Sequence, residues 1–225
     1  EQLELSLSLL RETRYRNGEA DALESLGSTF VMLGAWEEAR SRFEAALLIG
    51  REIENPKEEA DALVGLGRVA EQLESLELAE RSFRDALAIC ERIEHDEGTV
   101  VAALALGALL MTQGRTSEAR ERVTSALTMS QREEVWSVAV QAAVQLAALT
   151  GGDLGPARAL FAQYGDRLAL TERMETCYLL WRSGGKAADL AEARRLFGEL
   201  EEHAPLHYRD SMHATVPLYR KLLAG

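Results

Sequence analysis

A short run of residues recurs after forty positions in this chain, and the recurrence constrains the fold more than any single residue does. Residues 19–23 read Glu-Ala-Asp-Ala-Leu, and the same five letters return at residues 59–63. A Leu-Gly step at residues 26–27 returns at residues 66–67 and again at residues 106–107. A fixed period in this range is typical of stacked supersecondary units without a single closed core. The sequence therefore predicts a solenoid, a fold that offers an extended binding surface.

Small and aromatic residues keep the same step of forty at positions where packing needs them. Glycine removes a side chain where the first helix of a repeat must nearly touch the second, despite a helix-propensity cost of about 1 kcal/mol. Alanine allows the same approach from the facing helix, and phenylalanine fills the space between one helix pair and the next. The predicted structural contacts are Gly27, Gly67 and Gly107, with Ala39, Ala79 and Ala119, and with Phe43 and Phe83.

The spacing of apolar residues predicts two helices in each repeat. Between residues 20 and 32 the apolar residues fall at helical spacing, and Gly34 ends the run as a C-terminal stop signal. A second helix is expected from Trp36. Asn55 and Pro56 are expected to close it, because the residue before a proline is pushed out of helical geometry. Each repeat is thus predicted to be an antiparallel helix pair, and the fold class to be all-α.

This arrangement resembles the tetratricopeptide repeat family, whose unit combines a Leu-Gly step, a turn glycine and alanines spaced around a phenylalanine. The first matching unit consists of Leu26, Gly27, Gly34, Ala39, Phe43 and Ala46. The resemblance implies a right-handed α-solenoid of antiparallel helix pairs with about twelve helices. Two departures stand out. The step is forty where the common unit has 34 residues, so we expect longer second helices, and Glu74 stands where the second repeat would have its turn glycine.

The same signals divide residues 1–225 into a single array. Beyond residue 134 the pattern weakens, and the register of the first helices near residues 135–149 and 171–183 stays open because they lack the Leu-Gly step. Pro217 is expected to kink or break the last helix. The predicted parts are a second helix of a truncated repeat at 1–16, repeats at 19–55, 58–95 and 98–134, degenerate repeats at 135–168 and 171–203, and a capping helix at 206–224.

Charge and composition narrow the range of partners. The formal net charge is −12 and the sequence pI is near 4.9, which argues against a nucleic-acid backbone as a direct partner. Cys90 and Cys177 lack a metal or redox spacing and are interpreted as small buried residues. The sequence shows no secretory leader and no apolar run long enough to span a bilayer, so the cytoplasm is the expected compartment and no membrane is expected among the partners.

No catalytic motif is visible in the sequence. A phosphate-binding glycine loop, a Gly-x-Ser-x-Gly elbow, a His-Glu-x-x-His helix and paired cysteines are all missing. His203, His207 and His213 cluster near the end, but Pro205 keeps the first two off one helical face, which favours a surface or packing role over a metal site. His95 is interpreted as a turn residue. We therefore expect no enzyme activity, no cofactor and no metal.

In tetratricopeptide repeat proteins, ligands lie along the concave surface made by successive first helices, and the resemblance implies a partner-binding groove here. Its first part is acidic and its third part apolar, which favours a peptide or an amphipathic helix with a basic end. The alternative is that the superhelix buries this strip against its own chain. The predicted groove residues are Asp21, Glu24, Ser28 and Val31, then Asp61, Val64, Arg68 and Glu71, then Val101, Leu104, Ala108 and Met111.

The function implied by the resemblance is that of a noncatalytic protein–protein interaction module. The long repeats look like the arrays attached to bacterial multidomain signalling proteins, such as signalling ATPases and kinases. Residues 1–16 read as the second helix of a repeat whose first half is missing, so we expect the chain to be the C-terminal regulatory part of a larger protein. Two alternatives stay open, a small-ligand sensor and a structural or oligomerising segment, and the sequence leaves the oligomeric state open as well.

Overall fold

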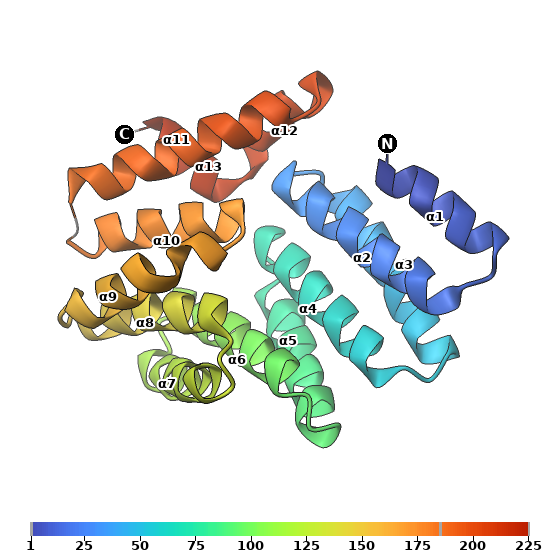
Figure 1. Ribbon diagram of the computed structural model, residues 1–225, viewed down its shortest axis with the longest axis horizontal. Helices are drawn as coiled ribbons and strands as arrows, with labels where there is room; N and C mark the ends of the chain where they lie inside the picture. The colour runs from blue at the N-terminus through green and yellow to red at the C-terminus, as the bar shows by residue number, and fades with distance from the viewer. Residues whose placement is uncertain (1, 185, 225) are drawn as a thin grey trace. The chain divides into compact units, whose positions relative to one another are not determined.

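The computed structural model describes residues 2–184 and 186–224 of the chain (Figure 1). These residues form thirteen α-helices and one 3-10 turn, and no strand occurs among them, so the predicted all-α fold class is confirmed. The chain divides into two compact units, unit 1 up to residue 105 and unit 2 from residue 106 onward. The sixth helix, α6, spans Asp96–Thr112 and therefore belongs partly to each unit.

Unit 1 consists of successive helices that pack against their neighbours in the sequence. The pairs α2 with α3, α3 with α4 and α4 with α5 are in contact, and the first helices α2 and α4 also touch each other. Three-residue turns connect these helices and make each successive pair antiparallel (Figure 1). The helices of this unit that precede α6 are α1 (Gln2–Glu12), α2 (Arg16–Met32), α3 (Trp36–Glu52), α4 (Pro56–Gln72) and α5 (Leu76–Arg92).

We expected the longer repeat to lengthen the second helices, but both helices of a repeat share the additional length. Each of the six helices from α2 to α7 has 17 residues, so first and second helices are equal in length. The reason is packing, since two antiparallel helices bury their apolar faces along their whole length only when both are extended together. The additional residues are therefore shared between the two helices of a repeat.

The turns show a period of twenty, half of the period seen in the sequence. In each turn one residue takes the left-handed conformation, and the backbone N–H of the next residue donates to the carbonyl five positions earlier, as Asn55 does to Gly50 at 2.8 Å. This is the Schellman pattern that satisfies the last carbonyls of a helix. The left-handed residues at this spacing are Arg14, Gly34, Glu54, Glu74, Glu94, Gly114 and Glu134.

Asn55 and Pro56 begin the next helix and do not end the previous one, which corrects the sequence interpretation. Helix α3 already ends at Glu52, and the left-handed Glu54, with φ +53°, turns the chain. The Asn55 side chain then accepts from the backbone N–H of Lys57 at 3.1 Å, and Pro56 occupies the first turn of α4. Proline suits that place because the first N–H groups of a helix have no partner in the helix.

Glu74→Gly is expected to stabilise the protein by about 1 kcal/mol. Glu74 has φ +59°, where a side chain is strained and glycine is not, and its counterparts Gly34 and Gly114 already hold glycine in the same turn. A matched substitution inside a helix, Glu121→Gly in α7, should instead cost about 1 kcal/mol. Thermal unfolding followed by circular dichroism separates the two. Equal losses for both variants would contradict the proposed role of the left-handed turn.

Phenylalanine and glycine make the closest contacts between helices of unit 1. The ring of Phe43 on α3 lies between Gly27 on α2 and Gly65 on α4: a Cβ on Gly27 would stand 2.8 Å from the ring, and one on Gly65 would collide with it. Gly67 on α4 meets the ring of Phe83 on α5 in the same way. One aromatic ring therefore joins its own repeat to the next, and glycine creates the space for it.

The other predicted small-residue contacts lie where close packing requires them. Ala39, Ala79 and Ala119 are all fully buried, with exposed fractions of 0%. In unit 2, a Cβ on Gly107 would stand 2.6 Å from Cγ2 of Val123 on α7. Gly65 was not among the predicted contacts, because its counterparts forty residues away are not glycine.

Unit 2 contains helices of less regular length. Contacts join α7 with α8, α8 with α9, and α10 with both α8 and α11. Helix α9 has only ten residues, and a 3-10 turn follows it directly. These elements are α7 (Thr116–Arg132), α8 (Trp136–Thr150), α9 (Gly155–Tyr164), η1 (Gly165–Arg167), α10 (Leu170–Arg182), α11 (Ala187–His203), α12 (Leu206–Thr215) and α13 (Pro217–Ala224).

The predicted capping helix at 206–224 is two helices, because Pro217 breaks it and does not merely kink it. Val216 is extended, with ψ 113°, as the residue before a proline tends to be, and α13 starts at Pro217. The short helix α13 packs on α11, where the rings of Phe197 and Tyr219 lie 4.7 Å apart. This break raises the count of α-helices over the described residues above the twelve expected.

Candidate functional site

Five charged side chains gather where the first helices α2 and α4 of unit 1 run side by side. Asp21 and Glu24 come from α2, and Lys57, Glu58 and Asp61 come from the first two turns of α4. We call these five residues the acidic cluster. Four carboxyl groups and one ammonium group give the cluster an excess of negative charge if all of them ionise.

Lysine is the single cation in the acidic cluster, and its hydrogen bond goes to one carboxylate. Lys57 Nζ donates to Asp61 Oδ2 at 2.8 Å and lies 3.9 Å from Glu58 Oε1. The hydrogen bond to Asp61 raises the pKa of Lys57, so this side chain is charged at neutral pH. One ammonium group cannot satisfy four carboxyl groups on two helices.

Two carboxyl oxygens of the acidic cluster are buried without a hydrogen bond. Glu24 Oε1 on α2 and Glu58 Oε2 on α4 have no hydrogen-bond partner among the described residues. Glu58 is only 5% exposed, so water reaches little of its side chain. An unsatisfied buried acceptor costs about 1 to 3 kcal/mol. The fold therefore keeps two buried oxygens without a hydrogen bond at this place.

Burial and mutual repulsion disfavour the ionised form of Glu24 and Glu58 in the acidic cluster. Burial raises the pKa of Glu24 to about 8, and the charges of Asp61 and Glu58 add to the effect. Burial also raises the pKa of Glu58, with a further contribution from Asp21. Removing water disfavours the charged carboxylate, and neighbouring negative charges act in the same direction. At neutral pH the cluster therefore carries less negative charge than its composition suggests.

The local sequence explains how these residues meet. Asp21 and Glu24 are three positions apart and lie on one face of α2, and Lys57 and Asp61 are four apart on α4. Glu58 is the third residue of α4, near the positive end of the helix dipole. Its counterparts forty residues away, Gly18 and Gly98, are glycine.

The sequence prediction found three members of the acidic cluster and missed two. Asp21, Glu24 and Asp61 were expected in the groove, and the structure brings them together. Lys57 and Glu58 were missed because they lie at the start of α4, before the groove positions taken from the family resemblance. One signal in the sequence could have identified Glu58: the equivalent positions forty residues away hold glycine, and position 58 alone holds glutamate.

The remaining predicted groove residues differ in their exposure. Ser28 and Arg68 are exposed, whereas Val31, Glu71, Val101, Ala108 and Met111 are half-buried. Burial raises the pKa of Glu71. Val64 and Leu104 are buried, at 9% and 6% exposure, so their side chains pack within the chain as the alternative interpretation described. The apolar part of the predicted strip is thus partly filled by the protein itself.

Histidine and cysteine side chains engage in other contacts. His203 Nδ1 lies 2.8 Å from the carbonyl oxygen of Glu199, and His213 Nε2 lies 2.8 Å from Glu201 Oε1. Over the described parts of the chain, no three histidine, cysteine or acidic side chains are grouped so that they could hold a metal ion. Burial raises the pKa of both Cys90 and Cys177 to about 11, which makes them poor nucleophiles.

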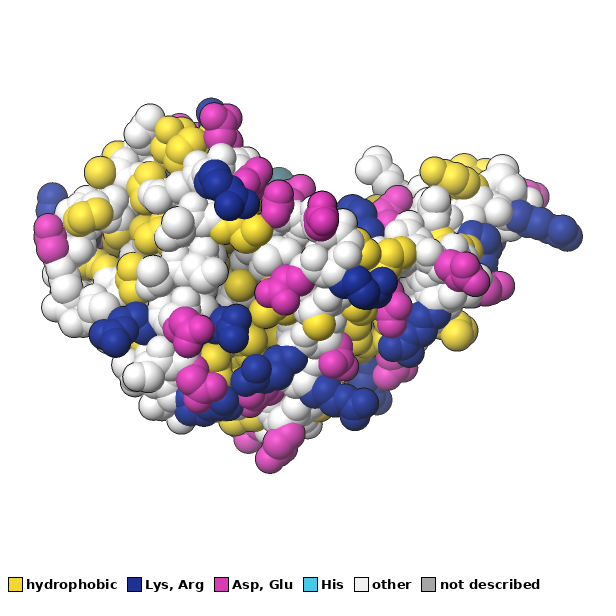
Figure 2. All heavy atoms as spheres, turned by 90° about the horizontal axis from the view of Figure 1, so that it is seen from below, with side chains coloured by type: hydrophobic (Ala, Val, Ile, Leu, Met, Phe, Trp, Pro, Cys, Tyr) yellow, Lys and Arg dark blue, Asp and Glu magenta, His cyan; other side chains and the backbone are white. Residues whose placement is uncertain are grey.

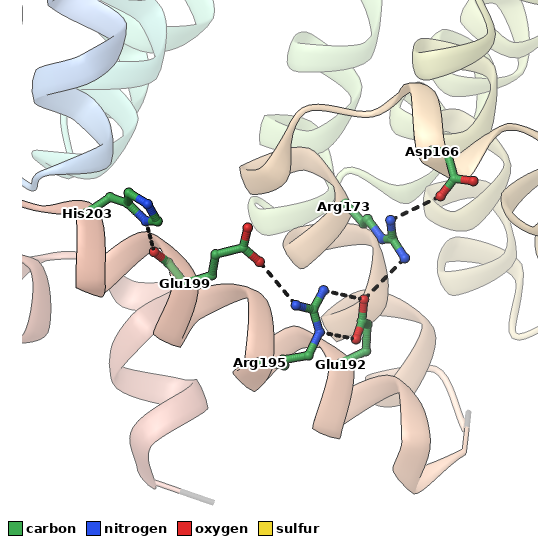
Figure 3. Close-up of polar contacts among 6 residues, drawn as sticks. All are labelled: Asp166, Arg173, Glu192, Arg195, Glu199 and His203. Atoms are coloured by element: carbon green, nitrogen blue, oxygen red, sulfur yellow. Dashed lines mark hydrogen bonds and ion pairs between the residues drawn. The ribbon is translucent and has the colours of Figure 1, made fainter.

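An ion-pair network in unit 2 joins α10, η1 and α11 (Figure 3). Arg173 contacts Asp166 at 3.1 Å and Glu192 at 3.2 Å, and Glu192 also accepts from Arg195 at 2.8 Å. Every acid in this network faces a cation. We therefore interpret the network as a structural contact that holds the irregular helices together. In the acidic cluster, by contrast, two acceptors lack partners.

The surface visible in Figure 2 mixes charges of both signs. Lysine and arginine side chains alternate there with aspartate and glutamate and do not form a continuous basic stripe. Across the described residues, none of the helices combines the length and the apolar character needed to cross a bilayer.

The fold matches known helical-repeat structures. A tetratricopeptide repeat family model matches residues 58–132. Aspartyl phosphate phosphatase F from Bacillus subtilis superposes with a TM-score of 0.63 at 15% identity, covering 87% of this chain and 51% of that chain. A Rap protein complexed with competence and sporulation factor superposes with a TM-score of 0.61 at 18% identity. The match covers 91% of this chain and 62% of that chain.

A third solved structure, BtubC (BKLC) from P. vanneervenii, superposes with a TM-score of 0.56 at 15% identity and covers 99% of this chain and 89% of that chain. At identities this low the likeness shows the fold alone. This chain spans 51% of the length of the phosphatase and 62% of the length of the Rap protein. No curated protein sequence matches it significantly.

Proposed function

Because this chain carries tetratricopeptide repeats, we propose that it is a noncatalytic protein–protein interaction module that binds a peptide or helix on its first helices. The partner segment carries a basic end, which enters the acidic cluster on α2 and α4. The observation that carries the proposal is the pair of buried acceptors without partners, Glu24 Oε1 and Glu58 Oε2. We also propose that the module is the regulatory part of a larger bacterial signalling protein in the cytoplasm.

Two contributions would provide the binding energy. Apolar burial contributes about 25 cal/mol per Å² before the costs of ordering the partner are subtracted. Val31 and Met32 at the end of α2 are half-buried and can be covered further by a partner. The acidic cluster contributes orientation and specificity more than raw affinity, because charges at a binding surface mainly select the complementary partner.

The relatives of known structure are compatible with this proposal. The Rap protein was solved in a complex with competence and sporulation factor, so a helical-repeat fold of this kind accommodates a binding factor. The wider role as part of a signalling protein rests on the family resemblance and on the greater length of the matched structures.

Reversing the charge of the acidic cluster is expected to abolish selection of basic peptides. The probe is a displayed library of random peptides, panned on the wild-type chain and on the triple variant Asp21→Lys, Glu24→Lys and Asp61→Lys. The wild type should enrich peptides with arginine or lysine near one end by at least tenfold. The triple variant should lose this enrichment while keeping its helical circular dichroism spectrum.

A control with three acid-to-lysine substitutions elsewhere separates the site from general electrostatics. Glu38, Glu77 and Glu91 are exposed on the second helices α3 and α5, and their replacement by lysine should leave the peptide selection unchanged. Loss of selection in this control as well would show that net charge alone attracts the peptides. Enrichment of peptides without basic residues by the wild type would contradict the proposed partner.

A further inference from the structure

The acidic cluster has a second property beyond its sign: its unsatisfied acceptors lie on two different helices. Glu24 on α2 and Glu58 on α4 each present one buried carboxyl oxygen without a hydrogen bond. Lys57 already pairs with Asp61 at 2.8 Å, which shows that a cation fits within this group of carboxylates. Lys57 leaves three carboxyl groups of the cluster without a hydrogen bond from it, and two of them, Glu24 and Glu58, each hold a buried oxygen without a partner.

We propose that Glu24 and Glu58 together receive the guanidinium group of one partner arginine, and that its arrival expels the proton held by the empty cluster. This inference rests on the proposed function, since it specifies the basic end of the partner. The site is thus an arginine receptor whose affinity depends on pH.

Arginine fits two separated carboxylates better than lysine does. A guanidinium is planar and presents five N–H donors along its edges, so one group can donate to two acids at once. Hydrogen bonds between an arginine and a carboxylate are charge-assisted and often bidentate. A lysine ammonium is a compact charge with three donors. Lys57 itself illustrates the limit, because it bonds to Asp61 at 2.8 Å and stays 3.9 Å from Glu58.

Charged groups surround Glu24, and without a bound cation its carboxyl group keeps a proton. Asp21 faces it from its own helix, and Lys57, Glu58 and Asp61 face it from α4. The charged groups of α1 and α3 near the start of α2 pair with residues of α2. Arg11 on α1 bonds to Glu19 at 2.9 Å. Glu52 on α3 pairs with Arg16, which also bonds to Glu19 at 2.6 Å. From α5, Cys90 is close enough to sense the charges of Asp61 and Lys57.

Proton release follows from the exchange of one positive charge for another. In the empty site burial and three neighbouring carboxyl groups hold the pKa of Glu24 at about 8. A guanidinium in contact with Glu24 favours the ionised carboxylate and lowers that pKa again. At any pH below about 8, binding must therefore displace a proton. The affinity then rises with pH, by up to about tenfold per pH unit, and levels off above pH 8.

The test uses small probes on the intact chain of 225 residues. N-acetyl-arginine amide is titrated against the isotope-labelled protein at pH 6, 7 and 8, and the side-chain carboxyl resonances of Glu24 and Glu58 report binding. N-acetyl-citrulline amide has nearly the same shape without the charge, and N-acetyl-lysine amide has the charge without the planar fork. We expect the arginine probe to shift both resonances, the lysine probe to bind more weakly, and the citrulline probe to leave them unchanged.

Proton release is measured independently by calorimetry in phosphate and in Tris, two buffers with different heats of ionisation. At pH 7 the heat of arginine binding should differ between them by the equivalent of up to one proton. Glu24→Gln should reduce this difference and weaken the pH dependence of the affinity, and any remaining dependence belongs to Glu58, whose pKa burial also raises. Glu71→Gln is the matched control, because burial raises the pKa of Glu71 too but its carboxyl lies outside the acidic cluster.

The outcomes distinguish this inference from the proposed function. An arginine probe that binds equally at pH 6 and pH 8, with no buffer-dependent heat, overturns proton release, even if peptide panning still selects basic ends. Equal binding of arginine and citrulline probes, or no binding of the arginine probe, overturns the receptor. If panning shows no dependence on the acidic cluster while the arginine probe binds with release of a proton, the receptor stands and the peptide-binding function fails.

Discussion

Replacing Gly67 with leucine is expected to lower the melting temperature of the protein by roughly 10 °C. Gly67 is buried on α4, and the ring of Phe83 on α5 packs so closely on it that even a single Cβ would collide. Phe83 is itself 0% exposed, so its ring has no free space into which it can move. Overpacking of this kind costs about 1 to 3 kcal/mol and occasionally more, and leucine adds several atoms beyond Cβ.

Two alanine substitutions of helical glycines should change the melting temperature in opposite directions. Gly67→Ala should still lower the melting temperature, whereas Gly198→Ala in α11 should raise it slightly, since nothing beyond its chain neighbours and the backbone of its own helix lies within 4 Å of the added Cβ. Alanine stabilises a helix interior by about 1 kcal/mol relative to glycine. Differential scanning calorimetry of the two variants measures both effects. A Gly67→Ala variant as stable as Gly198→Ala would contradict the close packing of α4 on α5.

Truncating the opposing ring provides a second check on the same contact. Phe83→Val leaves a cavity on its own, but it makes room for the new methyl group of Gly67→Ala. The third repeat already combines a glycine with valine at these positions, in Gly107 and Val123. The double variant should therefore lose less stability than the sum of the two single variants. Strict additivity would show that the two residues do not share the space between the helices.

The period of forty was sufficient to predict the fold class and the residues that join the helices. Periodic placement of Gly27 and Phe43 reflects a contact that each repeat must make, and such contacts leave a trace in the sequence. The helix lengths left no such trace. Equal helices of 17 residues follow from packing along the full length of a pair. The left-handed turns at Glu54 and Glu74 could not be predicted, because the residue there is not the glycine that usually marks such a turn.

The candidate site was only partly predictable, because it depends on a difference between repeats and not on what they share. Asp21 and Asp61 occupy equivalent positions and were found by the resemblance. Glu58 replaces a glycine in one repeat only. Its place in the acidic cluster can be recognised only when α2 and α4 are known to lie side by side. Val64 and Leu104 were expected in the groove, yet burial depends on neighbouring helices that the sequence does not position.

The pKa of Glu24 leads to the second large effect, a loss of stability as the pH rises. Burial and neighbouring carboxyl groups raise this pKa from the ordinary 4.5 to about 8 in the folded protein. Between these two values the folded state holds a proton that the unfolded state has lost, so each increase in pH favours unfolding. The stabilisation from this proton is complete below pH 4.5 and is lost as the pH rises through about 8.

Glu24→Gln should remove most of this dependence, because the amide keeps the shape of the side chain and does not ionise. One proton changes stability by at most about 1.4 kcal/mol per pH unit, and the partial exposure of Glu24 reduces this. We therefore expect the wild type to lose about 2 kcal/mol relative to the variant between pH 6 and pH 8, or roughly 5 °C in melting temperature.

Thermal melts of both proteins, followed by far-ultraviolet circular dichroism across this range, measure the difference directly. Glu58 and Glu71 also have a raised pKa, so the wild-type curve alone contains several contributions. The gap between wild type and variant isolates Glu24. Glu38→Gln, at an exposed position of α3, should follow the wild type at every pH. Parallel curves for the wild type and Glu24→Gln would show that Glu24 is already ionised in the folded protein, and proton-coupled arginine binding would then have no physical basis.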